Sequence, residues 1–230
     1  MATKNTINST QRKLALSGWL YEASISDYNS PFKHQKFLFF YEALAKVSGD
    51  KYEFSGLKGY KHGPVFSAVW GDRNHEADIF LNASCEVYRK QPSLVNVERA
   101  IMGLFIVQAF TMDELIRITH TMNIWNTKKD EIDKALADSP GKAHNIPLFE
   151  DDFNDNDSLI ISKLAAAFPY KFIENAKVIT IERNNFIFTK EDAERLTPEQ
   201  YDVLIQLYND EELENPVYAS IDKDGTIIVD

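Results

Sequence analysis

One cysteine and five histidines are the side chains of this sequence most suited to nucleophilic or metal chemistry. The histidines are His34, His62, His75, His120 and His144. Cys85 would need one of them beside it to form a thiolate–imidazole pair, but it lies inside a predicted helix rather than at a helix start, where a thiolate is stabilised. One thiol among scattered histidines also lacks the ligand spacing of a zinc site. We therefore expect no catalytic cysteine, no metal site and no cofactor.

The acidic stretch DDFNDNDS contains part of a calcium-binding pattern. Its alternating oxygen ligands would be Asp152, Asn154 and Asn156. A calcium loop also requires Gly at its sixth position and Glu at its twelfth, where this chain has Asp157 and Lys163. We therefore predict a solvated loop in which Asp157 or Ser158 caps the following helix.

Other enzyme motifs are missing from the sequence. Gly56 and Gly59 lack the third glycine and the strand-to-helix context of a phosphate-binding loop, and no Gly-x-Ser-x-Gly or His-Glu-x-x-His occurs. The chain is therefore predicted not to be an enzyme. A hydrolase with an unrecognised site is the alternative, and it would lose turnover when His62 or Cys85 is substituted.

The stretch YKHGPVFSAVW places a titratable ring directly before a Gly-Pro pair. We expect Gly63 to act as a hinge and Pro64 to occupy the first turn of a helix, because proline presets the helical φ and needs no amide partner there. The apolar residues that would bury this helix are Val65, Phe66, Val69 and Trp70. His62 is interpreted as a packing or hydrogen-bonding residue, with catalysis as the alternative.

The net charge of −10 is distributed unevenly along the 230 residues. Residues 1–61 carry 9 Lys and Arg against 5 Asp and Glu, whereas residues 150–230 carry 7 against 19. A surface that grips nucleic acid needs clustered cations, so nucleic acid is a disfavoured partner and a basic protein a favoured one. The candidate acidic contacts are Glu191, Asp192, Glu194, Asp210, Glu211, Glu212 and Glu214. Alternatively, these acids serve only to keep the protein soluble.

Apolar periodicity and capping residues predict a helical body in residues 1–148. Helical segments are expected at 10–23, from Ser30-Pro31 to Gly49, at 75–89 and 94–110, after the Thr111–Glu114 capping box, and from Trp125 to Ala137. The helix after Pro31 is so rich in large apolar groups that it must be central. Between Asp50 and Lys61 the period is lost, which predicts a loop with one short extended segment.

Residues 149–230 are predicted to form a small, acidic α+β appendage packed on this body. A helix is expected at 158–168, a hairpin over 177–189 that turns at Asn184-Asn185, a helix capped by Thr197, and a second hairpin that turns at Asp224-Gly225. The predicted fold class is therefore mainly α, with an appendage that contains two β-hairpins. The polar N-terminus and the absence of a long apolar run favour a cytoplasmic protein without a membrane partner.

Two stretches of the chain carry a recognisable pattern: residues 34–70, which contain HQKFLFF, Tyr60 and Gly63-Pro64-Val65, and residues 114–125, which contain ELIRITH and Trp125. Together they resemble a known family, the Panacea or SocA-like antitoxin domain. The first matches its Leu-Gln-Lys-Leu-Leu-Tyr-Tyr helix and its aromatic residue before Gly-Pro-Val, and the second its Leu-x-x-Leu-Thr-His followed by Trp. The residues that carry the resemblance, as motif or adjoining positions, are Gln35, Lys36, Phe37, Phe40, Tyr60, His62, Gly63, Pro64, Val65, Trp70, Thr119, His120 and Trp125. The resemblance covers residues 10 to about 145 and departs from the family at His34, where an aliphatic residue is usual.

The resemblance implies an antitoxin that neutralises a co-encoded toxin by binding it directly. Panacea domains occur beside very different toxins, including translation inhibitors related to alarmone synthetases that modify tRNA. Such a toxin needs a basic surface, which an acidic antitoxin would meet quickly and cover. The alternative is a proteolytic adaptor or phage-borne counter-defence protein, with a protease as second partner. A DNA-binding repressor is disfavoured, because no helix presents a convincing row of Arg or Lys.

Overall fold

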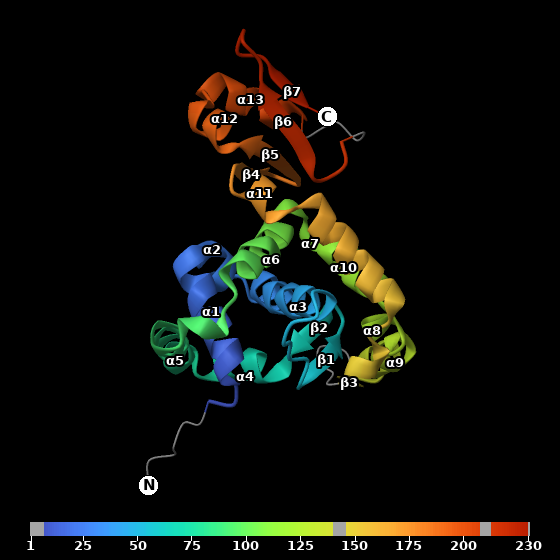
Figure 1. Cartoon of the computed structure of the whole chain (residues 1–230). Coiled ribbons are helices and arrows are strands. Elements are labelled where there is room, and N and C mark those ends of the chain that lie inside the picture. Colours follow the sequence, from blue (N-terminus) through green and yellow to red (C-terminus); the bar gives the residue numbers. More distant parts are fainter. Residues whose placement is uncertain (1–6, 140–145, 208–212, 230) are drawn as a thin grey trace.

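The structure of the protein is a computed structural model that describes residues 7–139, 146–207 and 213–229. It is mainly helical with two small sheets, and the C-terminal strands and helices form a separate group beside a larger helical body (Figure 1). The predicted mainly α fold with a C-terminal region containing strands is confirmed at this level. None of the described helices is long and apolar enough to cross a membrane.

The larger body consists of helices and one small sheet at its side (Figure 1). The helices are α1 (Gln11–Ala23), α2 (Ile25–Asn29), α3 (Pro31–Val47), α4 (Ser67–His75), α5 (Ala77–Lys90), α6 (Val97–Ala109), α7 (Met112–Thr121), α8 (Asn123–Asn126), α9 (Lys129–Asp138), α10 (Asp155–Ala167) and α11 (Tyr170–Ile173). Short 3-10 turns are η1 (Pro92–Leu94) and η2 (Glu150–Asp152). The antiparallel sheet, in the order β2-β1-β3, consists of β1 (Leu57–Tyr60), β2 (Gly63–Phe66) and β3 (Ile146–Pro147).

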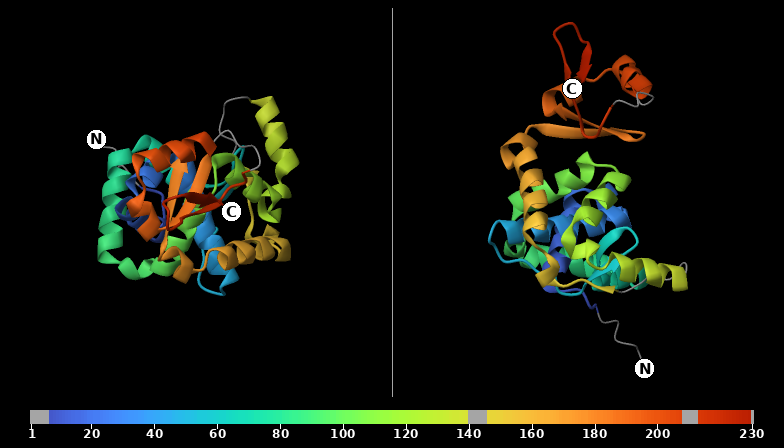
Figure 2. Two further views of the ribbon diagram at one scale, coloured as in Figure 1. Left: turned by 90° about the horizontal axis from the view of Figure 1, so that it is seen from above. Right: turned by 90° about the vertical axis from the view of Figure 1, so that its right-hand side faces the viewer.

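Helix α3 lies in the middle of this body (Figure 1), and Figure 2 shows the body and the C-terminal group from two further sides. It begins as predicted, with the Ser30 hydroxyl accepting from the Lys33 amide and Pro31 in the first helical position. Every residue from His34 to Ala45 is buried, and the helix packs against α6, α10 and β2. The prediction that the Phe-rich helix is central is therefore confirmed.

The predicted capping boxes are confirmed at two further helices, and the cap of a third helix, at Thr10, was not among the predictions. Thr10 caps α1 by accepting from the Lys13 amide. Thr111 and Glu114 form the complete capping box of α7, in which each side chain accepts from the other's amide. Thr197 and Gln200 exchange the same pair of bonds at the start of α13 (Pro198–Leu207). Local hydrogen bonding thus determines where these helices begin.

The Gly-Pro-Val stretch is a strand rather than a helix start, which corrects the prediction made for Gly63 and Pro64. Residues Gly63–Phe66 form β2, which pairs with β1 in the register Gly59↔Pro64, and helix α4 begins only at Ser67. Proline is tolerated because β2 is an edge strand of its sheet, so no second neighbour needs its missing amide. Gly63 still provides unusual backbone freedom, since its φ is +102°.

Three helical segments have different boundaries from those predicted. The segment predicted at 75–89 is α5, which a non-helical Glu76 separates from α4. The segment predicted at 94–110 is η1 followed by α6, whose cap is Asn96. The segment predicted from Trp125 is split into α8 and α9 at residues 127–128. In each case a local cap or turn interrupts an apolar pattern that continues across it.

The acidic stretch before α10 is not simply solvated. Asn154, rather than Asp157 or Ser158, caps the helix by accepting from the amides of Asn156 and Asp157. The Asp157 side chain is fully buried and accepts hydrogen bonds from the backbone amides of Asn123 and Ile124. The carboxylate therefore fixes the start of α8 to α10, a role that depends on tertiary contact and that the local pattern does not reveal.

The C-terminal group contains a four-stranded sheet in the order β4-β5-β6-β7. Its elements are β4 (Ala176–Ile181), β5 (Asn184–Thr189), α12 (Lys190–Arg195), α13, β6 (Val217–Ile221) and β7 (Ile227–Val229). One face of the sheet rests on the helical body through Ala176, Val178 and Ile187, and the other packs against α12 and α13 through Phe186 and Phe188. The second predicted hairpin, β6–β7, is confirmed, with Asp222–Gly225 in its turn.

The first hairpin of this group turns two residues earlier than predicted. The turn residues are Glu182 and Arg183, with Glu182 at a φ of +52°, and Asn184 and Asn185 belong to β5. Both asparagines are buried. The Asn185 side chain donates to the Ala109 carbonyl (3.2 Å) and accepts from the Thr180 hydroxyl (2.8 Å). Asn185 therefore bridges the sheet and the end of α6, and this contact outweighs its local preference for a turn.

The division predicted between residues 148 and 149 does not coincide with the change of core in the described residues. Ile161 of α10 and Phe168 belong to the large core of the helical body, and α10 packs against α3. The second, smaller core is formed by side chains from β4 onwards, such as Phe186 and Leu204. We use the term appendage below for residues 176–229.

Asn185→Ala should destabilise the protein, because it leaves the Ala109 carbonyl without its buried donor. We expect a loss of about 1–3 kcal/mol in the free energy of unfolding, measured by urea denaturation. The matched control is Asn82→Ala, which removes the same groups from an exposed helical position and should change the stability by less than about 0.5 kcal/mol. Equal effects of the two substitutions would contradict the bridging role.

Candidate functional site

Several residues that carry the family resemblance meet at the amino group of Lys36. This side chain, on α3, is 1% exposed. Its Nζ donates to the His62 carbonyl (2.7 Å) and to the Thr119 hydroxyl (2.7 Å). Within the described part of the chain no carboxylate pairs with it, and burial holds its pKa well below the usual value of lysine. Lys36 thus links three segments that are far apart in the sequence.

The Thr119 hydroxyl accepts a hydrogen bond from the Lys36 amino group and donates one to a backbone carbonyl of its own helix, α7. Its hydroxyl lies 2.9 Å from the Leu115 carbonyl and is completely buried. Thr119 and Lys36 are therefore each other's polar partner inside the core. The Lys36 Nζ–Thr119 Oγ1 contact resembles the hydroxyl–amine pair of an activated nucleophile, but both groups are buried and are not exposed to a ligand.

Gly63 permits the close approach of the β1–β2 hairpin to this buried pair. A Cβ at this position would lie 2.3 Å from Lys36 Nζ and 2.6 Å from Thr119 Oγ1. Both distances are far below van der Waals contact, and the φ of Gly63 is one that other residues rarely adopt. The glycine is thus required by both sterics and backbone conformation.

Two further motif residues hold the same hairpin. The Gln35 side chain accepts from the Phe66 amide at 2.8 Å. The Trp125 indole donates to the Tyr60 carbonyl at 3.1 Å. The hairpin is thus attached to α3 and α8 by three separate polar contacts, made by Gln35 and Lys36 of α3 and Trp125 of α8.

His120 stacks on Trp125 with a centroid distance of 3.6 Å and an interplanar angle of 7°. Burial and the nearby Lys36 lower the pKa of His120 to about 4, although a hydrogen bond to the Lys61 backbone raises it. The ring is therefore neutral at pH 7. His62 is exposed, and its pKa is also lowered, chiefly by partial burial. His120 therefore acts as a packing group, and His62 contributes the backbone carbonyl that accepts from Lys36.

The remaining motif residues are structural in their placement. Phe37 and Phe40 are fully buried, and Phe37 stacks on Trp19. Pro64 and Val65 lie in β2, and half-buried Trp70 on α4 has its ring 6.5 Å from that of Tyr60. The structure therefore brings the motif residues into one cluster and its surrounding core.

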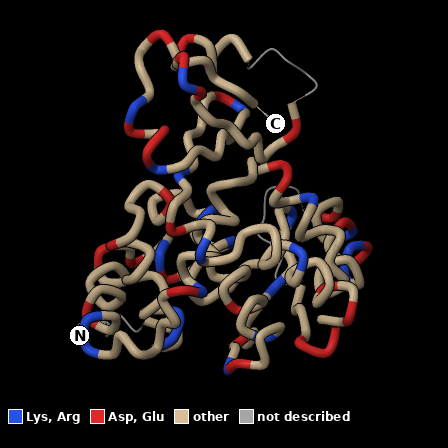
Figure 3. The backbone as a smooth tube through the Cα atoms, turned by 45° about the horizontal axis from the view of Figure 1, so that its top comes forward, with Lys and Arg blue, Asp and Glu red and all other residues tan. Residues whose placement is uncertain are grey.

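The candidate acidic contacts lie in a different part of the molecule. Glu191, Asp192 and Glu194 are on α12, and Glu214 precedes β6, whereas Asp210, Glu211 and Glu212 lie outside the described residues. The side chain of Glu191 is 81% exposed, but that of Asp192 is only 14% exposed. Figure 3 shows that acidic residues recur along the appendage with fewer Lys and Arg between them.

Exposed apolar side chains accompany these acids, which the sequence analysis missed. Tyr201, Val203 and Ile205 of α13 are 38%, 43% and 50% exposed. Asp202 stands between Tyr201 and Val203, and Glu199 stands two residues before Tyr201. Exposed apolar groups among acidic ones suit a protein interface better than a purely solvated surface. The signal available in the sequence was the apolar run after Thr197, which we interpreted only as a capped helix.

Cys85 and the histidines do not form a nucleophilic pair among the described residues. Burial raises the pKa of the Cys85 thiol, which disfavours the thiolate, and the charged groups that influence it are Glu22 and Arg89. In residues 7–139, 146–207 and 213–229, no group of three or more His, Cys, Asp or Glu is arranged to hold a metal ion. His144 lies outside the described residues.

Two buried carboxylates were missed by the sequence analysis. Glu42 on α3 accepts from Arg12 (2.8 Å) and Lys13 (2.5 Å), and Asp72 accepts from the amides of Asn8 and Ser9. A charged residue inside the apolar run of α3 was the available signal for Glu42. Asp72 had no such signal, since its partners lie 63 and 64 residues away.

No protein-family model, curated protein or solved structure matches the chain. The resemblance to the Panacea domain therefore rests on the sequence positions named above.

Gly63→Ala should destabilise the protein by about 2–4 kcal/mol, because it adds both a steric clash and an unfavourable φ. Urea denaturation would measure the change. Gly71→Ala on α4 is the matched control, since a Cβ there meets nothing within 4 Å, and it should leave stability equal or slightly higher. An unchanged unfolding midpoint for Gly63→Ala would show that the hairpin does not need this close approach.

His34, the position that departs from the family pattern, should make stability depend on pH. The ring is fully buried and contacts Ser17 Oγ and Arg73 NH1, and burial followed by the Arg73 charge lowers its pKa to about 3. Below pH 6.5 the unfolded chain binds a proton that the folded chain does not, so stability falls as the pH falls from 6.5 towards 3. This amounts to about 2 kcal/mol between pH 7 and pH 5.

The comparison of wild type with His34→Gln isolates this effect from other titrating groups. Urea denaturation at pH 7, 6 and 5 should give a shallower decrease for the variant. Parallel pH profiles for the two proteins would contradict a neutral, buried His34.

Proposed function

We propose that this protein is an antitoxin that neutralises a co-encoded toxin by direct binding, and that its helical body is a Panacea-like domain. The observation that carries the proposal is the convergence of Gln35, Lys36, Gly63, Thr119 and Trp125 on one hairpin. A chance resemblance would not require these positions to touch. Their contacts give each family-like residue a physical reason to be present.

The chemistry of the cluster supports a scaffold rather than a catalytic centre. Lys36 and Thr119 are at most 1% exposed, so neither amine nor hydroxyl meets a bound substrate. The polar side chains of Gln35, Lys36, Thr119 and Trp125 bind each other and the backbone, whereas the buried Nε2 of His120 has no hydrogen-bond partner among the described residues. Partner binding is therefore expected on the surface, away from the cluster.

The appendage has a surface suited to a basic protein. Glu191 and Glu194 are exposed on α12, and the exposed Tyr201 and Ile205 lie one turn apart on α13. Acidic groups accelerate association with a basic partner, and exposed aromatic or aliphatic groups supply the contact energy once the surfaces meet. A tRNA-modifying toxin needs a basic surface, so we propose that the appendage covers that surface.

Co-expression with the product of the neighbouring gene tests the proposal. That product alone should arrest growth, and this protein should restore growth and copurify with it. A harmless neighbour, or rescue without a stable complex, would overturn neutralisation by direct binding.

Glu191→Lys with Glu194→Lys should weaken the complex by about tenfold or more, because two attractive charges become repulsive. Isothermal titration calorimetry with the purified toxin at two salt concentrations would measure this, and the wild-type affinity should fall as salt rises. The matched control is Glu22→Lys with Asp138→Lys, an equal change of charge on exposed sites of the helical body. Equal losses for both pairs would mean that net charge, rather than the appendage surface, matters.

A further inference from the structure

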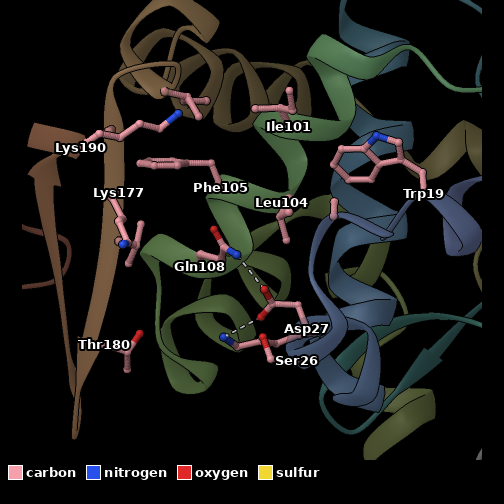
Figure 4. Close-up of a pocket in the computed structure, with 15 residues that line it drawn as sticks. Trp19, Ser26, Asp27, Ile101, Leu104, Phe105, Gln108, Lys177, Thr180 and Lys190 are labelled. Atoms are coloured by element: carbon pink, nitrogen blue, oxygen red, sulfur yellow. Dashed lines mark hydrogen bonds and ion pairs between the residues drawn. The ribbon is translucent and has the colours of Figure 1, made fainter. Parts of the chain in front are cut away.

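A cleft of about 620 Å³ lies where the appendage meets the helical body (Figure 4). One wall is strand β4, which contributes Ala176, Lys177, Val178 and Thr180, and the opposite wall comes from α6 and the α1–α3 region. Leu104 and Phe105 form part of the apolar floor, and Gln108 and Asp27 face β4 across the opening. The volume and position, at a junction between two cores, are typical of binding clefts.

Strand β4 is an edge strand, and its open edge lines this cleft. In the sheet order β4-β5-β6-β7 it has β5 on one side and no described strand on the other. The pair Ile181↔Asn184 closes the two-residue turn of the hairpin, so the main-chain groups of Ile181 face β5. Alternation along the strand turns the main-chain N–H and C=O of Val178 and Thr180 outward, towards the cleft. These groups are the ones that an added strand would bind.

The charge of the cleft is opposite to that of the whole chain. Its charged lining residues are Lys33, Lys177, Lys190 and Asp27. Asp27 is already saturated, because it pairs with Lys33 (3.1 Å) and accepts from Gln108 (2.7 Å) and the Ser24 hydroxyl (2.6 Å). Lys177 and Lys190 are exposed and have no carboxylate partner in the described residues. An acidic protein thus presents two free ammonium groups beside an open strand edge.

We propose that the open edge of β4 binds an extended acidic segment of a partner protein as an additional strand. Main-chain hydrogen bonds to Val178 and Thr180 would provide the affinity, and carboxylates beside Lys177 and Lys190 would select an acidic sequence. Apolar side chains of the segment would face Leu104 and Phe105. Lys190 is on the same helix as Glu191 and Glu194, but neither glutamate and no residue of α13 lines the cleft, so the inference does not depend on the antitoxin proposal.

A fluorescently labelled, acetylated peptide of alternating Glu and Val, about six residues long as in an average strand, is the probe. Anisotropy titration of the full chain should give saturable binding. The same peptide with Lys in place of Glu should bind at least about tenfold more weakly, because it meets two lysines. The same Glu–Val peptide with alternate amides N-methylated should also bind more weakly, since methylation removes strand pairing. Absence of saturable binding by the Glu–Val peptide would overturn the proposal.

Lys177→Glu with Lys190→Glu should reduce the affinity for the Glu–Val peptide by about tenfold or more. Both side chains are exposed, so the fold should persist, which circular dichroism would verify. Lys163→Glu on α10, exposed and outside the cleft, is the control and should bind as wild type does. Unchanged binding by the double variant would refute the assignment of these lysines.

A small-anion site is the competing explanation, and the same assay distinguishes it. If inorganic pyrophosphate displaces the peptide and the N-methylated peptide binds as well as the unmodified one, the cleft recognises charge alone and the strand proposal is wrong. If methylation abolishes binding while pyrophosphate does not compete, the strand proposal is supported.

Discussion

The burial of helix α3 on all sides is the constraint on which the rest of the helical body depends. A helix in this position must satisfy each of its polar side chains inside the protein, because an unpaired polar group in the core is costly. His34, Gln35, Lys36 and Glu42 are all buried on α3. Each of them binds a different neighbour, so the central helix determines the position of α1, α4, α7 and the β1–β2 hairpin.

The two buried charged residues of α3 have partners of opposite kinds. Glu42 has two cationic partners, Arg12 and Lys13, whereas Lys36 is bound only by neutral oxygens. Neutral acceptors stabilise an ammonium less than a carboxylate does, which is why burial dominates the pKa of Lys36. The hairpin that covers Lys36 is therefore held by hydrogen bonds from Lys36 and Trp125 and to Gln35. Gly63 allows its backbone to lie close to the Lys36 amino group and the Thr119 hydroxyl.

The appendage presents a different balance of forces. Its sheet is shared between two cores, because alternate residues of β4 and β5 face the helical body and α12–α13. This arrangement leaves β4 at an edge beside the body and creates the cationic cleft, while α12 and α13 place acids and apolar groups on the outside. One small unit therefore carries two surfaces of opposite charge, each suited to a different partner chemistry.

The features that the sequence determined by itself are those that depend on neighbouring residues. The caps at Ser30, Thr111 and Thr197 and the central position of the Phe-rich helix were predictable, because a hydroxyl bonds an amide three residues away and apolar density reflects burial. The residues that meet at Lys36 were also predictable, because they stand in two recognisable stretches of the sequence.

Tertiary structure alone decided the features that depend on distant partners. Gly63–Phe66 forms a strand that Gln35 holds through the Phe66 amide, Asn185 lies outside the turn because the Ala109 carbonyl is a buried acceptor for it, and Asp157 is buried by its bonds to two backbone amides of α8. The local sequence permits both outcomes at these positions. Burial and hydrogen bonding across more than 30 residues select one of them, and the same long-range packing forms the cleft beside β4, which the residues of β4 alone could not specify.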